Sequence, residues 1–329
     1  MRVVTDLLDA SPQVTCSVRP GATLPVARYA FVFRMQDELR LPEFAGSLLR
    51  GQFGASLRRI ACITGLPHCP PCPLYRTCPY PAIFETPPPH SHSLQRFSQV
   101  PNPYVIEPPP LGLRRVTAAE TLSFRIVLVG RALGQLPLIA YAFQRAFERG
   151  VGRLQAKGHL EDIVDETSGA PESVWDAERS RIHAHEQTLT VPQMPQTRAI
   201  TLTIATPLRL QSQGHPVPLE RLQPRTLFTA LLRRASLLFE LHASMPPVGT
   251  DAARLAAAAE QLTDERRLQW KDWTRFSSRQ KREMTLGGVV GEWTLAGELD
   301  ELLPWLWLGQ WLHVGKNASM GMGMYSLTW

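Results

Sequence analysis

Cysteine, lysine and long apolar runs are all scarce in this chain of 329 residues. Its five cysteines are too few to form a disulfide scaffold in a chain of this length. No uninterrupted apolar stretch reaches the roughly eighteen residues of a membrane span, and the first residues lack the apolar run of a secretion signal. We therefore expect a cytoplasmic protein with no membrane partner.

The composition supports packed cores. Hydrophobic residues make up 44% of the chain and charged residues 19%, which excludes a disordered protein. A chain this long exceeds the usual size of one core, so two domains are expected. The first half predicts a strand over 28–35, a helix from 42, strands over 82–86 and 122–129, a helix over 136–147 and strand-like pieces up to 176, with an irregular proline-rich loop over 87–110.

The second half repeats this order after a polar linker over 178–198. It predicts a strand over 199–210, helices over 224–238 and 252–262, a pair of strands with a bend over 284–295, a helix over 299–307 and a strand over 324–329. The predicted fold class is therefore α+β, with two tandem ferredoxin-like (βαββαβ, RRM-like) domains. Residues 1–192 form the first, with a cysteine-rich insertion, and residues 193–329 form the second.

Positive charge is concentrated in one segment of the second half. The chain carries 35 basic and 29 acidic residues, a net charge of +6, and residues 266–282 alone account for that excess. Interleaved Trp270, Trp273 and Phe276 could stack on nucleic-acid bases. The pattern predicts a polyanion-binding segment, although a solvated basic hairpin also fits. The predicted contacts are Arg266, Arg267, Lys271, Arg275, Arg279, Lys281 and Arg282.

Four of the five cysteines fall within seventeen residues. Cys62, Cys69, Cys72 and Cys78 contain one CxxC pair and two outlying thiols, enough ligands for a tetrahedral structural zinc. Reduced, buried thiols without metal are the alternative. A catalytic zinc is excluded, because four thiolates leave no open position for water.

A glycine-bearing loop over 313–323 lies between the last predicted helix and the last strand. Its backbone N–H groups and the Lys316 ammonium could hold a phosphate. The spacing matches neither a P-loop nor a dinucleotide fingerprint, so a plain tight loop is the alternative. The predicted phosphate or RNA contacts are Gly315, Lys316, Asn317, Ser319, Gly321 and Gly323.

Four segments together resemble the CRISPR-associated RAMP-superfamily endoribonucleases that process precursor CRISPR RNA. These are LLRGQFGASLRR, CPPCPLYRTCPYPAIFET, WKDWTRFSSRQKREMTLGGVVGEW and HVGKNASMGMG, in this order along the chain. The resemblance implies tandem ferredoxin-like domains with a cleft for RNA. It also implies two kinds of partner, CRISPR repeat or guide RNA and the other subunits of a CRISPR effector complex. Asn317 and Met320 depart from the loop's commoner pattern, in which a glycine and an aromatic are frequent.

The resemblance further implies metal-independent RNA cleavage, in which the 2′-hydroxyl attacks the adjacent phosphate and leaves a cyclic phosphate. No cofactor is required for that chemistry. The family often places a catalytic histidine just beyond the first helix, where this chain has His68, and some relatives use arginines instead. The candidate catalytic residues are His68, His313 and Arg50, with Arg58 as a further arginine, whereas His90 and His92 are expected at the surface.

Two other interpretations stay open. The chain could be a non-catalytic RNA-binding RAMP subunit of the same machinery, because it lacks an unambiguous set of histidine, tyrosine and lysine. It could also be a zinc-stabilised RNA-binding protein unrelated to CRISPR, which a second domain of another fold would favour.

Overall fold

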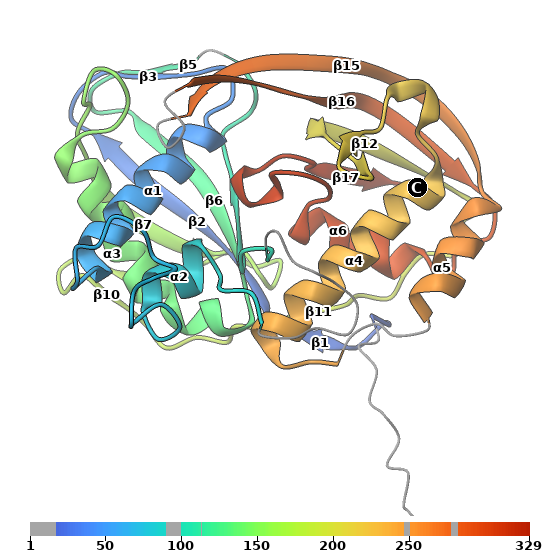
Figure 1. Cartoon of the computed structure of the whole chain (residues 1–329), viewed down its shortest axis with the longest axis horizontal. Coiled ribbons are helices and arrows are strands. Elements are labelled where there is room, and N and C mark those ends of the chain that lie inside the picture. The colour runs from blue at the N-terminus through green and yellow to red at the C-terminus, as the bar shows by residue number, and fades with distance from the viewer. Residues whose placement is uncertain (1–17, 90–99, 113, 247–250, 278–281) are drawn as a thin grey trace, which may run out of the picture.

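Two α/β halves lie side by side in the computed structural model, each with helices packed on one antiparallel sheet (Figure 1). The structure describes residues 18–89, 100–112, 114–246, 251–277 and 282–329, with the backbone alone for 273–277 and 282–285. Within this part of the chain, no helix is both long and apolar enough to span a membrane.

The N-terminal sheet has the strand order β4-β6-β2-β7, extended by β8. Its ferredoxin-like elements are β2 (Val26–Met35), α1 (Gly46–Ala61), β4 (Tyr104–Glu107), β6 (Thr121–Val129), α3 (Leu136–Arg149) and β7 (Gly158–Asp165). The smaller elements are β1 (Thr23–Leu24), β3 (Leu39–Leu41), α2 (Pro79–Phe84), β5 (Arg114–Val116), the 3-10 helix η1 (Gly130–Gln135), β8 (Glu172–Ser173), β9 (Trp175–Asp176), β10 (Arg181–Ile182) and β11 (Leu189–Thr190).

Aromatic side chains fill the space between this sheet and its helices. Phe31 of β2 stands opposite Phe124 of β6, with their rings stacked 5.7 Å apart. Phe143 of α3 packs on both rings, and Phe53 of α1 stacks on Phe143 at 4.8 Å. These rings are almost entirely shielded from solvent, so they contribute a large share of the apolar area that holds α1 and α3 to the sheet.

Three predictions for this half were wrong. The segment predicted as a strand over 82–86 is helical up to Phe84, the end of α2, because Pro79 stands in the first turn of that helix, where proline's fixed φ suits a helix. The second strand of the sheet is β4, inside the proline-rich segment predicted to be irregular. All four β4 residues are buried, so tertiary packing decides the conformation of a strand too short to show a pattern. Helix α1 begins at Gly46 rather than at Pro42.

The C-terminal sheet has the strand order β15-β16-β12-β17. Its ferredoxin-like elements are β12 (Ala199–Leu208), α4 (Pro224–Ala243), β15 (Thr263–Ser277), β16 (Arg282–Ala296), α6 (Leu303–Leu312) and β17 (Tyr325–Thr328). The others are β13 (Gln211–Ser212), β14 (His215–Pro216), the 3-10 helices η2 (Leu219–Arg221) and η3 (Ala318–Met320), and α5 (Asp251–Glu260). Trp293 of β16 is fully buried in this core.

Both sheets place the first and third strands of a βαββαβ unit in the centre, which is the ferredoxin-like arrangement. The prediction of two tandem ferredoxin-like domains is therefore confirmed. The boundary between residues 192 and 193 stays a prediction. Within the polar segment around it, β11 pairs with β1, so the end of the first half lies beside its beginning.

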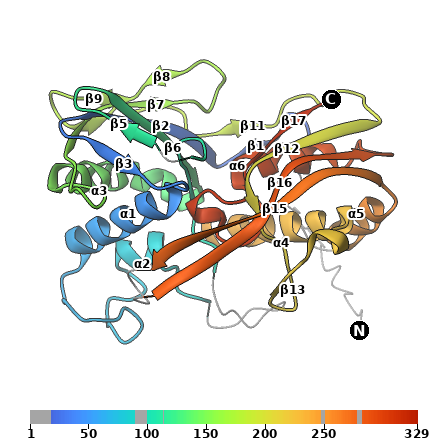
Figure 2. The same ribbon diagram turned by 90° about the horizontal axis from the view of Figure 1, so that it is seen from above.

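The pair of strands predicted over 284–295 is in fact one strand, β16, and its partner β15 contains most of the basic segment. Strand β12 pairs with β16 only from Val289 onward. On the other side of that point, residues 271–277 of β15 and 282–288 of β16 pair only with each other. They form a two-stranded ribbon about 25 Å long, at the usual rise per strand residue. Figures 1 and 2 show this ribbon crossing from the C-terminal half to the N-terminal half, toward the start of α1.

Candidate nucleic-acid interface

The glycine-bearing loop lies at the junction of the two halves. Its 3-10 turn, η3, packs against the start of α1 and against β4. A Cβ atom on Gly46 would overlap the carbonyl oxygen of Met320, and one on Gly321 would lie 2.5 Å from that of Ile106. The glycines thus allow the backbones of two domains to approach within contact distance.

Hydrogen bonds fix the loop from the C-terminal side. The Lys316 N–H donates to Arg209 O at 2.9 Å, and the Thr206 hydroxyl donates to Gly321 O at 2.6 Å. Asn317 adopts the left-handed region, with φ of 64°, where asparagine is tolerated better than most residues. The loop is therefore held in one conformation from both sides.

Only some of the loop residues that were predicted to contact RNA are accessible to solvent. Lys316 is exposed, and Gly315, Asn317 and Ser319 are half-buried. Gly321 and Gly323 are buried, so their place is in the packing of the loop rather than on its surface.

A buried ionic network underlies the loop. Glu107, at the end of β4, accepts from the Arg28 guanidinium at 3.0 Å and from His313 Nε2 at 3.3 Å. His313 Nδ1 faces Met322 O at 3.3 Å. Its ring is thus held between a carboxylate of the N-terminal half and the backbone of the loop. Arg28 also stacks over Trp311, 4.1 Å from the ring centre, which ties β2 to α6.

The network determines the protonation of Glu107. Burial acts to raise the pKa of this carboxyl, but the hydrogen bond from His313 and the charge of Arg28 outweigh it. The net result is a pKa below the ordinary value for glutamate. Glu107 is thus a carboxylate that depends on partners from both halves of the molecule.

The ribbon is attached to the same junction. Lys271 Nζ lies 2.7 Å from the Glu43 carboxylate, just before α1. Leu286 of the ribbon packs in a small apolar cluster with Phe44, Met320 and Met322. The ribbon, the loop and the start of α1 therefore form one continuous surface.

Carboxylates neutralise part of the basic segment. Arg266 pairs with Asp264, Arg267 with Glu265 at 3.2 Å, and Lys271 with Glu43. The +6 count for 266–282 omits these acids, which lie outside the segment in sequence. The side chains of Trp273, Arg275, Phe276, Arg279, Lys281 and Arg282 lie outside the described residues.

Trp270, the β15 residue at the base of the ribbon, has an aromatic side chain that faces solvent. Its ring is 37% exposed, and its indole N–H donates to Asp272 Oδ1 at 2.8 Å. The ring and this carboxylate lie over Gly287 of the paired strand, where a Cβ would collide with both. The ribbon thus holds Trp270 in a fixed, partly open orientation suited to stacking.

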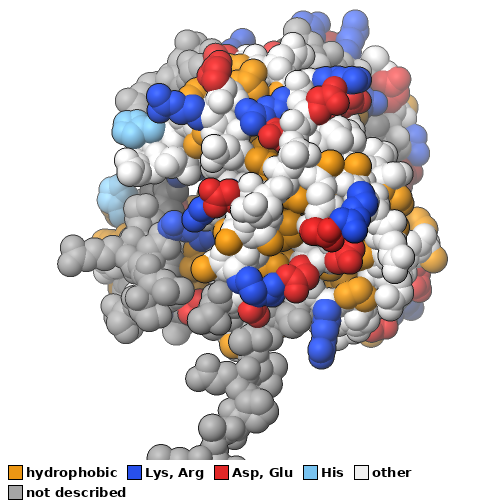
Figure 3. Space-filling view, turned by 90° about the vertical axis from the view of Figure 1, so that its right-hand side faces the viewer, with side chains coloured by type: hydrophobic (Ala, Val, Ile, Leu, Met, Phe, Trp, Pro, Cys, Tyr) orange, Lys and Arg blue, Asp and Glu red, His pale blue; other side chains and the backbone are white. Residues whose placement is uncertain are grey.

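Basic and acidic side chains are mixed on another face of the C-terminal half. Figure 3 shows Lys and Arg side chains beside Asp and Glu side chains there, around apolar surface. Arg225 pairs with Glu260, and Arg254 pairs with Glu301. This face therefore lacks the one-sided positive charge that a polyanion prefers.

The candidate catalytic residues do not lie together. Arg50, one turn into α1, stacks over Phe84 at 4.2 Å, and its Nε is buried without a hydrogen-bond partner. His68 is exposed in the cysteine-rich loop, while His313 is fully buried at the end of α6. Arg58 donates to Leu66 O and to Pro67 O, which supports that loop. His90 and His92 lie outside the described residues.

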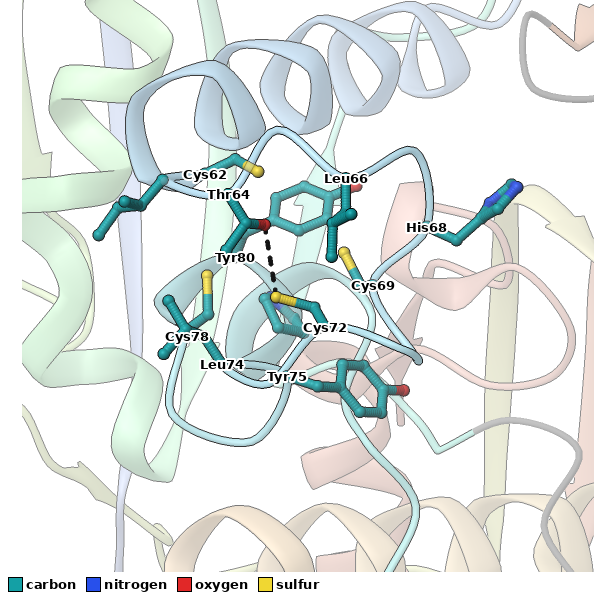
Figure 4. Close-up of a pocket in the computed structure, with 12 residues that line it drawn as sticks. Cys62, Thr64, Leu66, His68, Cys69, Cys72, Leu74, Tyr75, Cys78 and Tyr80 are labelled. Atoms are coloured by element: carbon teal, nitrogen blue, oxygen red, sulfur yellow. Dashed lines mark hydrogen bonds between the residues drawn. The ribbon is translucent and has the colours of Figure 1, made fainter.

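The four clustered cysteines line one cavity between the end of α1 and α2, and His68 points away from them (Figure 4). All four are free thiols, each partly accessible to solvent. Burial raises the pKa of the Cys69 thiol, and the charge of Glu85 adds to that effect. Across the described residues, no group of three or more His, Cys, Asp or Glu side chains already stands in metal-binding geometry.

The sequence argument missed Arg28, Glu43 and Glu107, which join the loop and the ribbon to the N-terminal half. One signal was available for Glu107. It is the single charged residue in the otherwise apolar run over 104–107, and a buried carboxylate requires a partner.

Comparisons with known proteins cover both halves. Residues 202–325 match the family model of the CRISPR-associated endoribonuclease Cas6, and residues 24–187 match a model described as an N-terminal domain, AF_1859_N. A search of curated proteins found no match.

Solved structures resemble the whole chain. A Cas6 (TTHB231) product complex gives a TM-score of 0.56 at 17% identity, covering 92% of this chain and 100% of that chain. Thermus thermophilus Cas6 (TTHB231) gives 0.52 at 17% identity, covering 93% and 99%. A partial Cas6-RT-Cas1–Cas2 complex gives 0.56 at 16% identity, covering 94% of this chain and 47% of that chain. At these identities the likeness shows the shared fold.

The close approach at Gly46 predicts opposite effects for two glycines of α1. Gly46→Ala should destabilise the protein by about 1–3 kcal/mol, because the new methyl group meets the Met320 carbonyl. Gly51→Ala should stabilise it by about 1 kcal/mol, since Gly51 has open space and alanine favours a helix. Urea unfolding of both variants measures the difference, and equal effects would contradict the packing.

The buried carboxylate predicts a pH-dependent loss of stability. Glu107→Gln should lower the free energy of unfolding by about 3 kcal/mol at neutral pH, since it removes one member of a buried ionic network. The pKa of Glu107 is depressed in the folded state, so its contribution is complete above the unfolded value of about 4.3 and is lost as pH falls below it.

Urea titrations of wild type and variant at several pH values test this. The gap between them should narrow below about pH 4. Glu298→Gln is the control, because Glu298 pairs with Arg198 at the exposed surface and should cost less than about 1 kcal/mol at any pH. A pH-independent gap for Glu107→Gln would show that the carboxylate charge does not matter.

Proposed function

We propose that this chain is a Cas6-type endoribonuclease that processes precursor CRISPR RNA by cutting within the repeats, and the match of residues 202–325 to the Cas6 family model supports the proposal. The observation that carries the proposal is the junction, where the loop, the start of α1 and the ribbon meet on two ferredoxin-like domains. A repeat RNA laid along this surface contacts both halves at once.

The ribbon and the loop divide the binding between them. Lys316 in the loop and the arginines and lysines of the ribbon neutralise phosphates, which gives affinity that falls with salt. Their existing ion pairs are mostly at the surface, where such pairs contribute little and a phosphate can replace the carboxylate. Trp270 offers a face on which an unpaired base stacks.

The reaction needs no metal. The 2′-oxygen bonds to phosphorus as the bond to the 5′-oxygen breaks, which leaves a 2′,3′-cyclic phosphate and a 5′-hydroxyl. A base takes the 2′-proton, an acid supplies a proton to the 5′-oxygen, and a cation stabilises the phosphorane charge. Imidazole suits both proton transfers, because its ordinary pKa lies near 6.5.

Arg50 and His68 are two alternative candidates for the reacting side chain, because they lie at opposite ends of α1. Arg50 projects from α1 one turn beyond the contact with the loop, and a guanidinium stabilises phosphorane charge. His68 is exposed and points away from the cysteines, so it is free to meet RNA. His313 is instead proposed to position the loop, since both of its nitrogens face buried acceptors.

We further propose that the product stays with the protein and that other CRISPR subunits bind it. Similar structures include a Cas6 product complex and a Cas6-RT-Cas1–Cas2 complex, which supports both parts. The second candidate function is a non-catalytic RNA-binding RAMP subunit. Arg50 lies near the start of α1, His68 lies beyond the last turn of α1, and His313 lies at the end of α6, and this separation favours that alternative.

A cleavage assay separates the two functions. End-labelled repeat RNA should be cut once in EDTA, and a 2′-deoxy substitution at the cut site should abolish the cut, because the attacking oxygen is then missing. One of the two variants Arg50→Ala and His68→Ala should slow cleavage about 100-fold or more, and the other should leave the rate nearly unchanged. His159→Ala, an exposed histidine of β7, is the matched control. Tight binding without any cut would establish the non-catalytic subunit.

Trp270 should contribute stacking rather than charge. Trp270→Ala should weaken RNA binding about tenfold, whereas Trp270→Phe should keep most of the affinity. The slope of log affinity against log salt should stay the same in both variants, since no phosphate contact is lost. Fluorescence anisotropy at several salt concentrations measures both quantities. A changed slope with Trp270→Ala would mean that the substitution disturbs the ribbon instead.

A further inference from the structure

The cysteine-rich loop connects two helices whose ends both carry cysteine. Cys62 follows the last residue of α1, and Cys78 directly precedes α2. Between them, the Cys72 N–H donates to Cys69 O at 2.9 Å, which closes the CxxC turn. Four thiols that are far apart along the loop are thereby gathered around one cavity, and Figure 4 shows their sulfur atoms surrounding a common space.

Apolar burial explains only in part how this loop is held, since Cys69 and Cys78 pack against the N-terminal core while other apolar side chains stay exposed. Ile63 is 87% exposed, and Leu66 and Leu74 are 38% and 37% exposed. The hydrogen bonds of the loop are mainly turns of its own backbone and the Arg58 contacts to Leu66 and Pro67 carbonyls. A segment with so little core of its own usually needs a disulfide or a metal.

We propose that Cys62, Cys69, Cys72 and Cys78 bind one Zn²⁺ that fastens the end of α1 to the start of α2. Four thiolates complete a tetrahedral shell, so the metal is structural and takes no part in RNA cleavage. At present Cys72 Sγ contacts Thr64 Oγ1 at 3.5 Å and Cys78 Sγ lies 3.8 Å from Ala61 O. Rotation of these side chains toward the common space forms the site, with release of the thiol protons.

The metal also bears on the first helix of the candidate site. Phe84 of α2 fits against Gly54 of α1, where a Cβ would collide with its ring. The same ring carries the Arg50 guanidinium. A zinc that holds α2 in place therefore keeps the surface on which Arg50 rests, whether or not the chain cleaves RNA.

Metal content tests the proposal on the whole protein purified without chelator. Elemental analysis should find about one zinc per chain. Cys62→Ser and Cys78→Ser should each lose most of it and lower the melting temperature. Cys16→Ser is the matched control, because Cys16 is the fifth cysteine and stands outside the cluster in sequence. It should keep the full zinc content.

Thiol chemistry of the wild type provides a readout that does not depend on folding of the variants. One cysteine should react with a maleimide before a chelator is added and all five afterwards, and replacement of zinc by Co²⁺ should give a thiolate-to-cobalt absorption band. Absence of zinc with all thiols reactive would overturn the proposal. So would zinc retained equally in every variant, or a mass that shows disulfides among the four cysteines.

Discussion

Backbone meets backbone where the two halves of this molecule join, and the structure depends on that contact. Met320 of the loop presents its carbonyl to Gly46 at the start of α1, and Gly321 lies against Ile106 at the end of β4. A methyl group at either glycine needs space that the other domain's backbone already occupies. Because these two positions have no side chain, the loop can pack directly against helix α1 and strand β4.

The ionic network beneath the loop makes the two halves interdependent. Glu107 comes from the N-terminal sheet, and His313 comes from the end of a C-terminal helix, 206 residues further along. Separated halves would deprive this carboxylate of the His313 hydrogen bond and would deprive the imidazole of its carboxylate partner. Breaking such a buried set is costly, so the relative placement of the domains is specified by chemistry as well as by apolar contact. Arg28 reinforces it by stacking on Trp311.

Sequence periodicity predicted the helices and strands that are long enough to show a repeating pattern of apolar residues. Strands such as 28–35 and helices such as 136–147 are long enough to show which face is buried. Strand β4 could not be predicted in the same way, because its four residues are buried by neighbours that lie far away in sequence. Helix α2 was missed for a similar reason, since its single short turn lies among prolines.

The candidate site was predictable only in part. The loop and the basic segment were visible as composition, but their meeting at one junction was not predicted. The sequence did not show that carboxylates neutralise part of the basic segment, because Glu43 and Asp264 lie outside that segment. Burial of Gly321 likewise depends on a backbone from the other domain, which local sequence does not reveal.

Because lysine is scarce in this chain, reagents that react with amines can label the junction selectively. The chain has four lysines: Lys271 lies on the ribbon, Lys316 lies on the loop, Lys157 is exposed beside β7, and Lys281 belongs to the basic segment but lies outside the described residues. Reagents that acylate primary amines do not react with guanidinium groups, so the many arginines are not labelled. Apart from the N-terminal amine, acylation of this protein therefore reports on the junction and the basic segment, and Lys157 supplies the internal standard.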